Sequence, residues 1–229
     1  MKPCRSLRRG SAWLLAATLA GTVASSAVAR PHAHASHASG RFDYYVVSLS
    51  WSPSYCLTHL DDTEQCSKGY GFVLHGLWPQ NRDGTWPSDC DGGAGPDTGP
   101  DPATVARTLA FMPSRNLIAH EWAVHGTCSG LAPRAYFDLA DRAFTAIAVP
   151  QALRTPQRPP TLSATDVADA FVAANPGLSE TMISVQCRNG SELSEVRICV
   201  NRDSLAPQPC GGRVRNACRY GTLKIDAAR

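Results

Sequence analysis

Beyond its first 29 residues, this 229-residue sequence has no hydrophobic run that approaches the roughly 18 residues of a membrane-spanning helix. It has no Cys-X-X-Cys pair, the spacing typical of structural zinc sites. Lysine is scarce, with three residues against nineteen arginines, and no internal repeat is visible. The hydrophobic content of 43% argues against a disordered chain. The sequence therefore indicates a globular protein of one large or two small domains.

The net charge of +3 belongs to the N-terminus rather than to the rest of the chain. Four of the 22 basic residues precede residue 30, which leaves 18 basic against 19 acidic residues and a net charge of −1. The basic start is followed by an apolar stretch over residues 12–24 and by small residues at 27–29 that a signal peptidase can cut. We predict a signal peptide over 1–29, a flexible leader over 30–40, and export to the periplasm or the medium. An uncleaved membrane anchor is the alternative.

Cysteine usage agrees with export. Eight cysteines remain once the one at position 4 is removed with the signal peptide: Cys56, Cys66, Cys90, Cys128, Cys187, Cys199, Cys210 and Cys218. An even number in an exported chain predicts four disulfides, and the sequence alone allows 105 ways of pairing them.

The hydrophobic pattern predicts a mixture of strands and helices. Strands are expected over residues 42–51, 71–75, 182–186 and 195–200. Helices are expected from Asp101-Pro102 up to a break at 112–114, and over 115–127, 133–149 and 163–175. Residues 80–102, rich in Asn, Asp, Gly and Pro, form a long surface loop. Because strands and helices do not alternate in a βαβ rhythm, the fold class is α+β.

Two short stretches concentrate the histidines. FVLHGLWPQ (72–80) and HEWAVHGTC (120–128) hold three of the four histidines outside the leader. If the second stretch is a helix, Glu121 and His125 lie about 40° apart on one face, whereas His120 lies about 140° from His125. A zinc helix has its histidines four residues apart, as in His-Glu-X-X-His, and here the spacing is one residue longer. We therefore expect no metal.

Two histidines and a carboxylate suit acid–base catalysis. A strand carries His75 and a helix carries Glu121 and His125, so the fold has to bring them together. Imidazole has an unperturbed pKa near 6.5, so one ring can be neutral while another is protonated. Cleavage of RNA by its own 2′-hydroxyl group needs both forms at once, as base and as acid, and needs no cofactor.

The two stretches resemble the active-site segments of the ribonuclease T2 family, secreted or vacuolar RNA endonucleases. Each has a His, a Trp and a Gly in the family's arrangement, and they occur in the family's order about 45 residues apart. The resemblance covers residues 42–220 and implies a catalytic domain over 41–229, with a mainly antiparallel sheet packed with helices and braced by disulfides. It implies a monomeric enzyme that acts on RNA and not on DNA, with low base specificity.

The resemblance also implies roles for single residues. His75 is the general acid toward the 5′-oxygen and His125 the general base toward the 2′-hydroxyl, and these roles exchange in a second step. Glu121 and His120 contact the phosphate and stabilise the transition state. The products are 2′,3′-cyclic phosphates and then 3′-phosphates, and the rate follows a bell-shaped pH profile set by two imidazole groups, highest between acid and neutral pH.

The same resemblance implies which residues bind the base, and it shows one difference from the family, at Val124. Trp78 helps to form a base pocket, and Gln80 and Trp86 also contact the base. The family usually has Lys where this chain has Val124, so a positive charge near the phosphate is missing or comes from an arginine elsewhere. Arg82, Arg115 and the C-terminal arginines are the candidates.

The resemblance supports one pairing of the cysteines: Cys56 with Cys66, Cys90 with Cys128, Cys187 with Cys218, and Cys199 with Cys210. Two other functions remain open. One is a secreted binding protein on a ribonuclease fold with weak catalysis, which the departure at Val124 suggests. The other is a zinc-dependent hydrolase, which chelators would inhibit.

Overall fold

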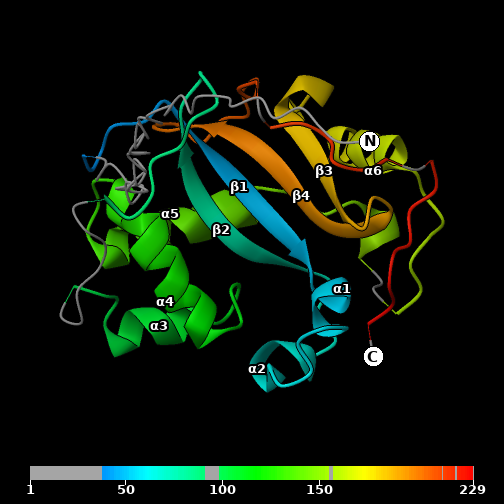
Figure 1. The fold of residues 1–229 in the computed structure, drawn as a ribbon, viewed down its shortest axis with the longest axis horizontal. Coiled ribbons are helices and arrows are strands. Elements are labelled where there is room, and N and C mark those ends of the chain that lie inside the picture. The colour runs from blue at the N-terminus through cyan, green and yellow to red at the C-terminus, as the bar shows by residue number, and fades with distance from the viewer. Residues whose placement is uncertain (1–37, 91–97, 155–156, 213, 220, 229) are drawn as a thin grey trace, which may run out of the picture. The chain divides into compact units, whose positions relative to one another are not determined.

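The computed structural model describes residues 38–90, 98–154, 157–212, 214–219 and 221–228, all within one unit, Ala35–Arg229. The centre is a four-stranded antiparallel sheet in the order β2-β1-β4-β3 (Figure 1). The strands are β1 (Tyr44–Trp51), β2 (Phe72–Gln80), β3 (Ile183–Arg188) and β4 (Glu192–Asn201). The predicted α+β class with an antiparallel sheet is therefore confirmed.

Strand β2 is longer than predicted and contains a β-bulge. It continues to Gln80 through Pro79, which an edge strand tolerates because its missing N–H breaks no pairing within the sheet. The register with β1 shifts so that His75 is an extra residue between Leu74 and Gly76. Leu74 and Leu77, three residues apart, are therefore both buried in the same core, which a regular strand does not allow.

The helices follow the predicted start signals. The α-helices are α1 (Ser52–Cys56), α2 (Thr63–Cys66), α3 (Pro102–Thr108), α4 (Arg115–Val124), α5 (Pro133–Thr145) and α6 (Ala164–Ala174), and short 3₁₀ turns are η2 (Gly126–Cys128), η3 (Gln151–Leu153) and η4 (Glu180–Met182). Asp101, Ser114 and Ser163 cap α3, α4 and α6 through their side chains. α4 and α5 end three and four residues before the predicted positions. The short α1 and α2 were not predicted, because helices of five and four residues show no periodicity.

The main core lies on one face of the sheet. Alternate residues of the strands pack there against buried side chains of the helices, such as Trp122 of α4, Phe137 of α5 and Phe171 of α6. The opposite face holds only a small hydrophobic cluster around Tyr44, Val46 and Cys199. The strands therefore have room for polar side chains on this second face.

The four disulfides join the cysteines in the predicted pairs. Cys90–Cys128 links the segment after β2 to the turn after α4.

The predicted signal peptide, and the leader up to residue 37, lie outside the described residues. The last two residues of the predicted leader contact the turn after α4: Ser39 donates to the carbonyl oxygen of Thr127 at 2.6 Å, and the Gly40 N–H donates to that of Cys128 at 2.9 Å.

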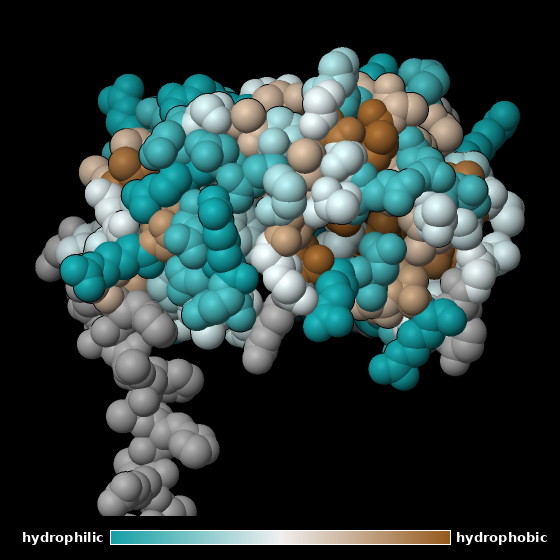
Figure 2. Space-filling model, turned by 90° about the horizontal axis from the view of Figure 1, so that it is seen from above, coloured by the Kyte–Doolittle hydropathy of each residue, from teal (hydrophilic) through white to brown (hydrophobic). Residues whose placement is uncertain are grey.

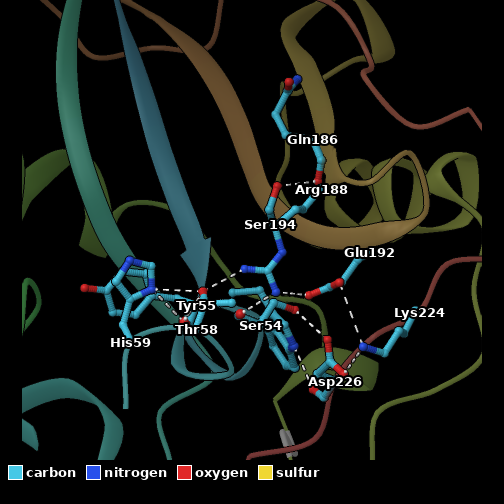
Figure 3. Close-up of polar contacts among 11 residues, drawn as sticks. Ser54, Tyr55, Thr58, His59, Gln186, Arg188, Glu192, Ser194, Lys224 and Asp226 are labelled. Atoms are coloured by element: carbon cyan, nitrogen blue, oxygen red, sulfur yellow. Dashed lines mark hydrogen bonds and ion pairs between the residues drawn. The ribbon is translucent and has the colours of Figure 1, made fainter. Parts of the chain in front are cut away.

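A charged network joins the C-terminal segment and β4 to α1, the short helix after β1 (Figure 3). Arg188 donates to the carbonyl oxygen of Ser54 at 2.9 Å and pairs with the buried Glu192. Lys224 approaches Glu192 at 3.9 Å and Asp226 at 2.9 Å, and Ser54 donates to Asp226 at 3.1 Å. Because each buried carboxylate oxygen in this network has a partner, burial of the charges is compensated.

Figure 2 shows one face of the molecule, on which hydrophobic residues form small groups separated by hydrophilic ones. Among the described residues, the large hydrophobic side chains that are exposed are Leu60, Trp86 and Leu131. No helix in the described ranges combines the length and the hydrophobicity needed to cross a membrane.

Candidate active site

The bulge in β2 places His75 on the polar face of the sheet, between two carboxylates. Its Nδ1 lies 2.7 Å from Oε1 of Glu195 on β4, and its Nε2 lies 3.6 Å from Oε1 of Glu121 on α4. The His75 side chain is 30% exposed. The ring is thus held from both sides and still open to solvent.

Glu195 belongs to an ion pair that runs along β4. Arg197 donates to Oε2 of Glu195 from Nε at 2.8 Å and approaches it with Nη2 at 2.6 Å. Ser48 of β1 pairs with Arg197 on one side and with Gly76 on the other, so only small residues separate β2 from this pair. His75 reaches Glu195 across that gap.

Glu121 is buried and is held by Trp78. Its Oε2 accepts a hydrogen bond from Nε1 of Trp78 at 2.7 Å, and its side chain is 1% exposed. Burial raises the pKa of Glu121 to about 7, although the charge of His75 and the Trp78 hydrogen bond act against this. Near neutral pH this group therefore exists in both protonation states.

His125 follows the last residue of α4, and its backbone N–H donates to the carbonyl oxygen of Glu121 at 3.0 Å. Its ring centroid is 5.4 Å from that of Trp78, and the ring of His75 meets Trp78 from another side at 5.1 Å. Within the described residues, Nδ1 of His125 is buried without a hydrogen-bond partner. Both imidazoles are therefore ring neighbours of Trp78.

The imidazoles of His125 and His75 differ in the direction in which their pKa values are shifted. Burial lowers the pKa of His125 to about 3, helped by repulsion from His120 and His75. Burial also acts to lower the pKa of His75, but the hydrogen bond and charge of Glu195, together with the charge of Glu121, raise it above its ordinary value. The pKa of His75 is thus higher than that of His125, so between the two values His125 is neutral while His75 is protonated.

The pKa of Glu195 is shifted downward by the groups around it. Burial acts to raise its pKa, but the hydrogen bond from His75 and the charges of His75 and Arg197 together lower it to about 2. Glu195 is therefore ionised over the whole range in which His75 titrates.

The other predicted residues lie outside this cluster. His120 is exposed on α4 and forms no hydrogen bond, ion pair or ring contact with any described residue. Gln80 ends β2, where its carbonyl oxygen accepts from the Asp43 N–H at 2.8 Å. Trp86 is 47% exposed, in the loop after β2. The structure brings His75, Glu121, His125 and Trp78 together, places His120 near enough to act electrostatically on His125, and leaves Gln80 and Trp86 apart.

Of the arginines suggested by the sequence, Arg115 is engaged elsewhere. Arg115 forms an exposed ion pair with Glu64 at 3.0 Å, and the backbone N–H of Arg82 donates to Asp43. The guanidinium carbon of Arg197 lies 5.0 Å from the ring centroid of Trp78. In the described part of the chain, the positive charge beside the cluster is therefore that of Arg197.

The sequence did not single out Glu195, and it suggested Arg197 only as one of the C-terminal arginines. Their signal is visible in hindsight: in ELSEVRICVN two charged residues alternate with Val196 and Ile198, in a strand that is paired on both sides. Charged side chains on an interior strand are unusual and indicate a functional role. For metal binding, the described residues contain no group of three or more His, Cys, Asp or Glu that could hold an ion.

Comparison with known proteins gives the family. The model of the ribonuclease T2 family matches residues 42–210. A ribonuclease of Aeromonas hydrophila is 48% identical over 101 residues, which is 44% of each chain, so the match spans less than half of that relative. Ribonuclease DdI of Dictyostelium discoideum is 30% identical over 215 residues, covering 82% of this chain and 86% of the relative. A solved RNase-related protein from Calystegia sepium shares the fold with a TM-score of 0.64 at 24% identity, covering 84% of this chain and 100% of its own. This chain belongs to the ribonuclease T2 family.

Proposed function

We propose that this protein is an exported, monomeric endoribonuclease that cleaves single-stranded RNA through the 2′-hydroxyl group, without a metal and with low base specificity. The observation that carries the proposal is the asymmetry of the two imidazoles. Nδ1 of His75 contacts a carboxylate, and Nδ1 of His125 has no hydrogen-bond partner among the described residues. A neutral base and a charged acid are the two forms that this reaction consumes.

In the proposed first step, Nε2 of neutral His125 takes the proton of the 2′-hydroxyl. The 2′-oxygen forms a bond to phosphorus while the bond from phosphorus to the 5′-oxygen breaks, and protonated His75 gives its Nε2 proton to that oxygen. The product is a 2′,3′-cyclic phosphate. In the second step His75 takes a proton from water, the water oxygen opens the cyclic ester, and His125 protonates the 2′-oxygen to leave a 3′-phosphate.

Glu121 and Trp78 complete the proposed site. With its pKa raised to about 7, Glu121 carries a proton in part of the molecules and can donate it to a phosphate oxygen as negative charge develops there. Trp78 is fixed by its hydrogen bond to Glu121 and offers a ring to a base. Contacts of His120 with phosphate, and of Gln80 and Trp86 with a base, stay part of the proposal.

The proposal is tested with three oligonucleotides of one sequence: RNA, 2′-O-methyl RNA and DNA, each with EDTA present. We expect cleavage of the RNA alone, because only RNA has the nucleophile. Cleavage of the DNA or of the methylated strand would contradict the mechanism, and inhibition by EDTA would indicate a metal-dependent hydrolase. Tight binding of RNA without turnover would favour a binding protein on this fold.

The pH dependence of kcat/KM follows from the two histidines. The rate rises as His125 loses its proton, and with a pKa lowered to about 3 this rise is complete well below the range expected for an ordinary imidazole. The rate falls as His75 loses its proton, and since its pKa is raised the fall begins above about 6.5. A rate measured on a dinucleoside monophosphate that still increases above pH 9 would contradict this assignment.

A further inference from the structure

We infer that Glu195 is a positioning residue for proton transfer from His75: it binds Nδ1, so that the proton on Nε2 faces the leaving 5′-oxygen, and Arg197 holds Glu195 in this place. This inference rests on the proposed function and deepens it. Neither residue lies in the two sequence segments that carry the other members of the site.

The contacts divide the two oxygens of Glu195 between two partners. Oε1 lies 2.7 Å from Nδ1 of His75, and Oε2 accepts from Nε of Arg197 at 2.8 Å and lies 2.6 Å from its Nη2. The Glu195 side chain is only 13% exposed. Since each oxygen has its own partner, rotation of the carboxylate costs at least one charge-assisted hydrogen bond.

The bond at Nδ1 fixes which proton of His75 can leave. Nδ1–H donates to the carboxylate, so the proton available to a substrate is on Nε2. Nε2 now lies 3.6 Å from Oε1 of Glu121, longer than a hydrogen bond, and Glu121 already accepts from Trp78. A substrate oxygen can therefore take the Nε2 proton without competing with a strong existing contact.

The charged groups that face His75 come from two elements besides its own strand. Glu195 and Arg197 lie on β4, and Glu121 and His125 lie in or directly after α4. Glu195 is the carboxylate in hydrogen-bond contact, and it also neutralises Arg197. Loss of its negative charge therefore weakens the acceptor at Nδ1 and leaves the guanidinium to repel the imidazolium, so both effects act against the protonated ring.

Glu195→Gln tests the inference on two substrates. A dinucleoside monophosphate has a nucleoside leaving group that needs the proton, whereas uridine 3′-(4-nitrophenyl phosphate) has a leaving group that departs without one. We expect kcat on the dinucleotide to fall by about 10- to 100-fold and kcat on the nitrophenyl ester to fall by less than about threefold. We expect the alkaline limb of the pH profile on the dinucleotide to move to lower pH by about one unit.

The matched control is Glu192→Gln. Glu192 lies on the same strand, and its carboxylate pairs with Arg188 and Lys224 instead of the site. This variant should lower the melting temperature and leave the ratio of the two rates as in the unchanged protein. If Glu195→Gln lowers both rates equally, or leaves the alkaline limb in place, Glu195 is not a positioning residue.

A second measurement avoids dependence on a folded variant. In the unchanged protein, NMR titration of the His75 ring should give a pKa above 6.5 and a slowly exchanging Nδ1 proton, with signals assigned through His75→Ala. A pKa below 6.5 with no such proton would overturn the inference. If the unchanged protein cleaves neither substrate, the proposed function fails instead, so the two failures are distinguishable.

Discussion

Replacing His125 with alanine is expected to lower kcat on a dinucleoside monophosphate by about 10³-fold or more, because it removes the only neutral imidazole in the described cluster. Glu121 is not expected to replace it, because one of its oxygens accepts from Trp78 and its proposed role is to donate a proton to the phosphate. The fold should be little affected, because the His125 side chain makes no hydrogen bond to any described residue, and the bonds of its backbone N–H and carbonyl oxygen do not depend on the side chain. Steady-state kinetics and thermal unfolding, measured on the same preparation, check both parts.

His59→Ala is the matched control for loss of an imidazole. His59 is exposed and stacks on Tyr55 at a centroid distance of 4.0 Å, and its ring Nδ1 forms hydrogen bonds with Tyr55 and Thr58. The kcat of the His59→Ala protein should stay within about threefold of that of the unchanged protein. A His125→Ala protein that keeps a tenth or more of the activity would show that His125 is not the base.

Replacing Gly76 with alanine is expected to disrupt the active site, because the added methyl group has no room. A Cβ at this position would lie 2.0 Å from Oε2 of Glu121 and 2.2 Å from Nε1 of Trp78, the two atoms that share the buried hydrogen bond. Gly76 does not lie in the left-handed region, so backbone strain adds nothing. The displaced hydrogen bond and overpacking should together lower the free energy of unfolding by about 3 kcal/mol, and kcat should fall by about 100-fold.

Gly99→Ala separates this steric effect from the general effect of adding a methyl group. No described atom lies within 4 Å of the position of its Cβ, and Gly99 is likewise outside the left-handed region. Denaturant unfolding should show Gly99→Ala within about 0.5 kcal/mol of the unchanged protein. Equal stability and activity of the Gly76→Ala and Gly99→Ala proteins would contradict the close packing of β2 against Glu121.

The sequence predicted most elements because their signals are local. Alternation and β-branched residues indicated β1, and the Asp101 and Ser163 caps indicated the starts of α3 and α6. The length of β2 was predicted wrongly, because a Trp-Pro pair reads as a strand end unless the strand is known to be at an edge.

The site was predictable only in part, because half of it depends on strand order. Glu121 and His125 are joined by helical spacing, and the concentration of histidines in two short stretches added His75. The contact of His75 with Glu195 spans 120 residues in sequence and exists because β1 alone separates β2 from β4. No local pattern reports which strands are neighbours. For the same reason the cation beside the cluster is Arg197, although Val124 occupies the position where the family usually has lysine.

Phosphorus-31 NMR of a dinucleoside monophosphate during cleavage, with EDTA present, tests the central claim most directly. Attack by the 2′-oxygen, with His125 as base and His75 as acid, predicts that a 2′,3′-cyclic phosphate signal appears first and then gives way to a 3′-phosphate. A 5′-phosphate product, or a 3′-phosphate that accumulates with no cyclic signal before it, would contradict the claim.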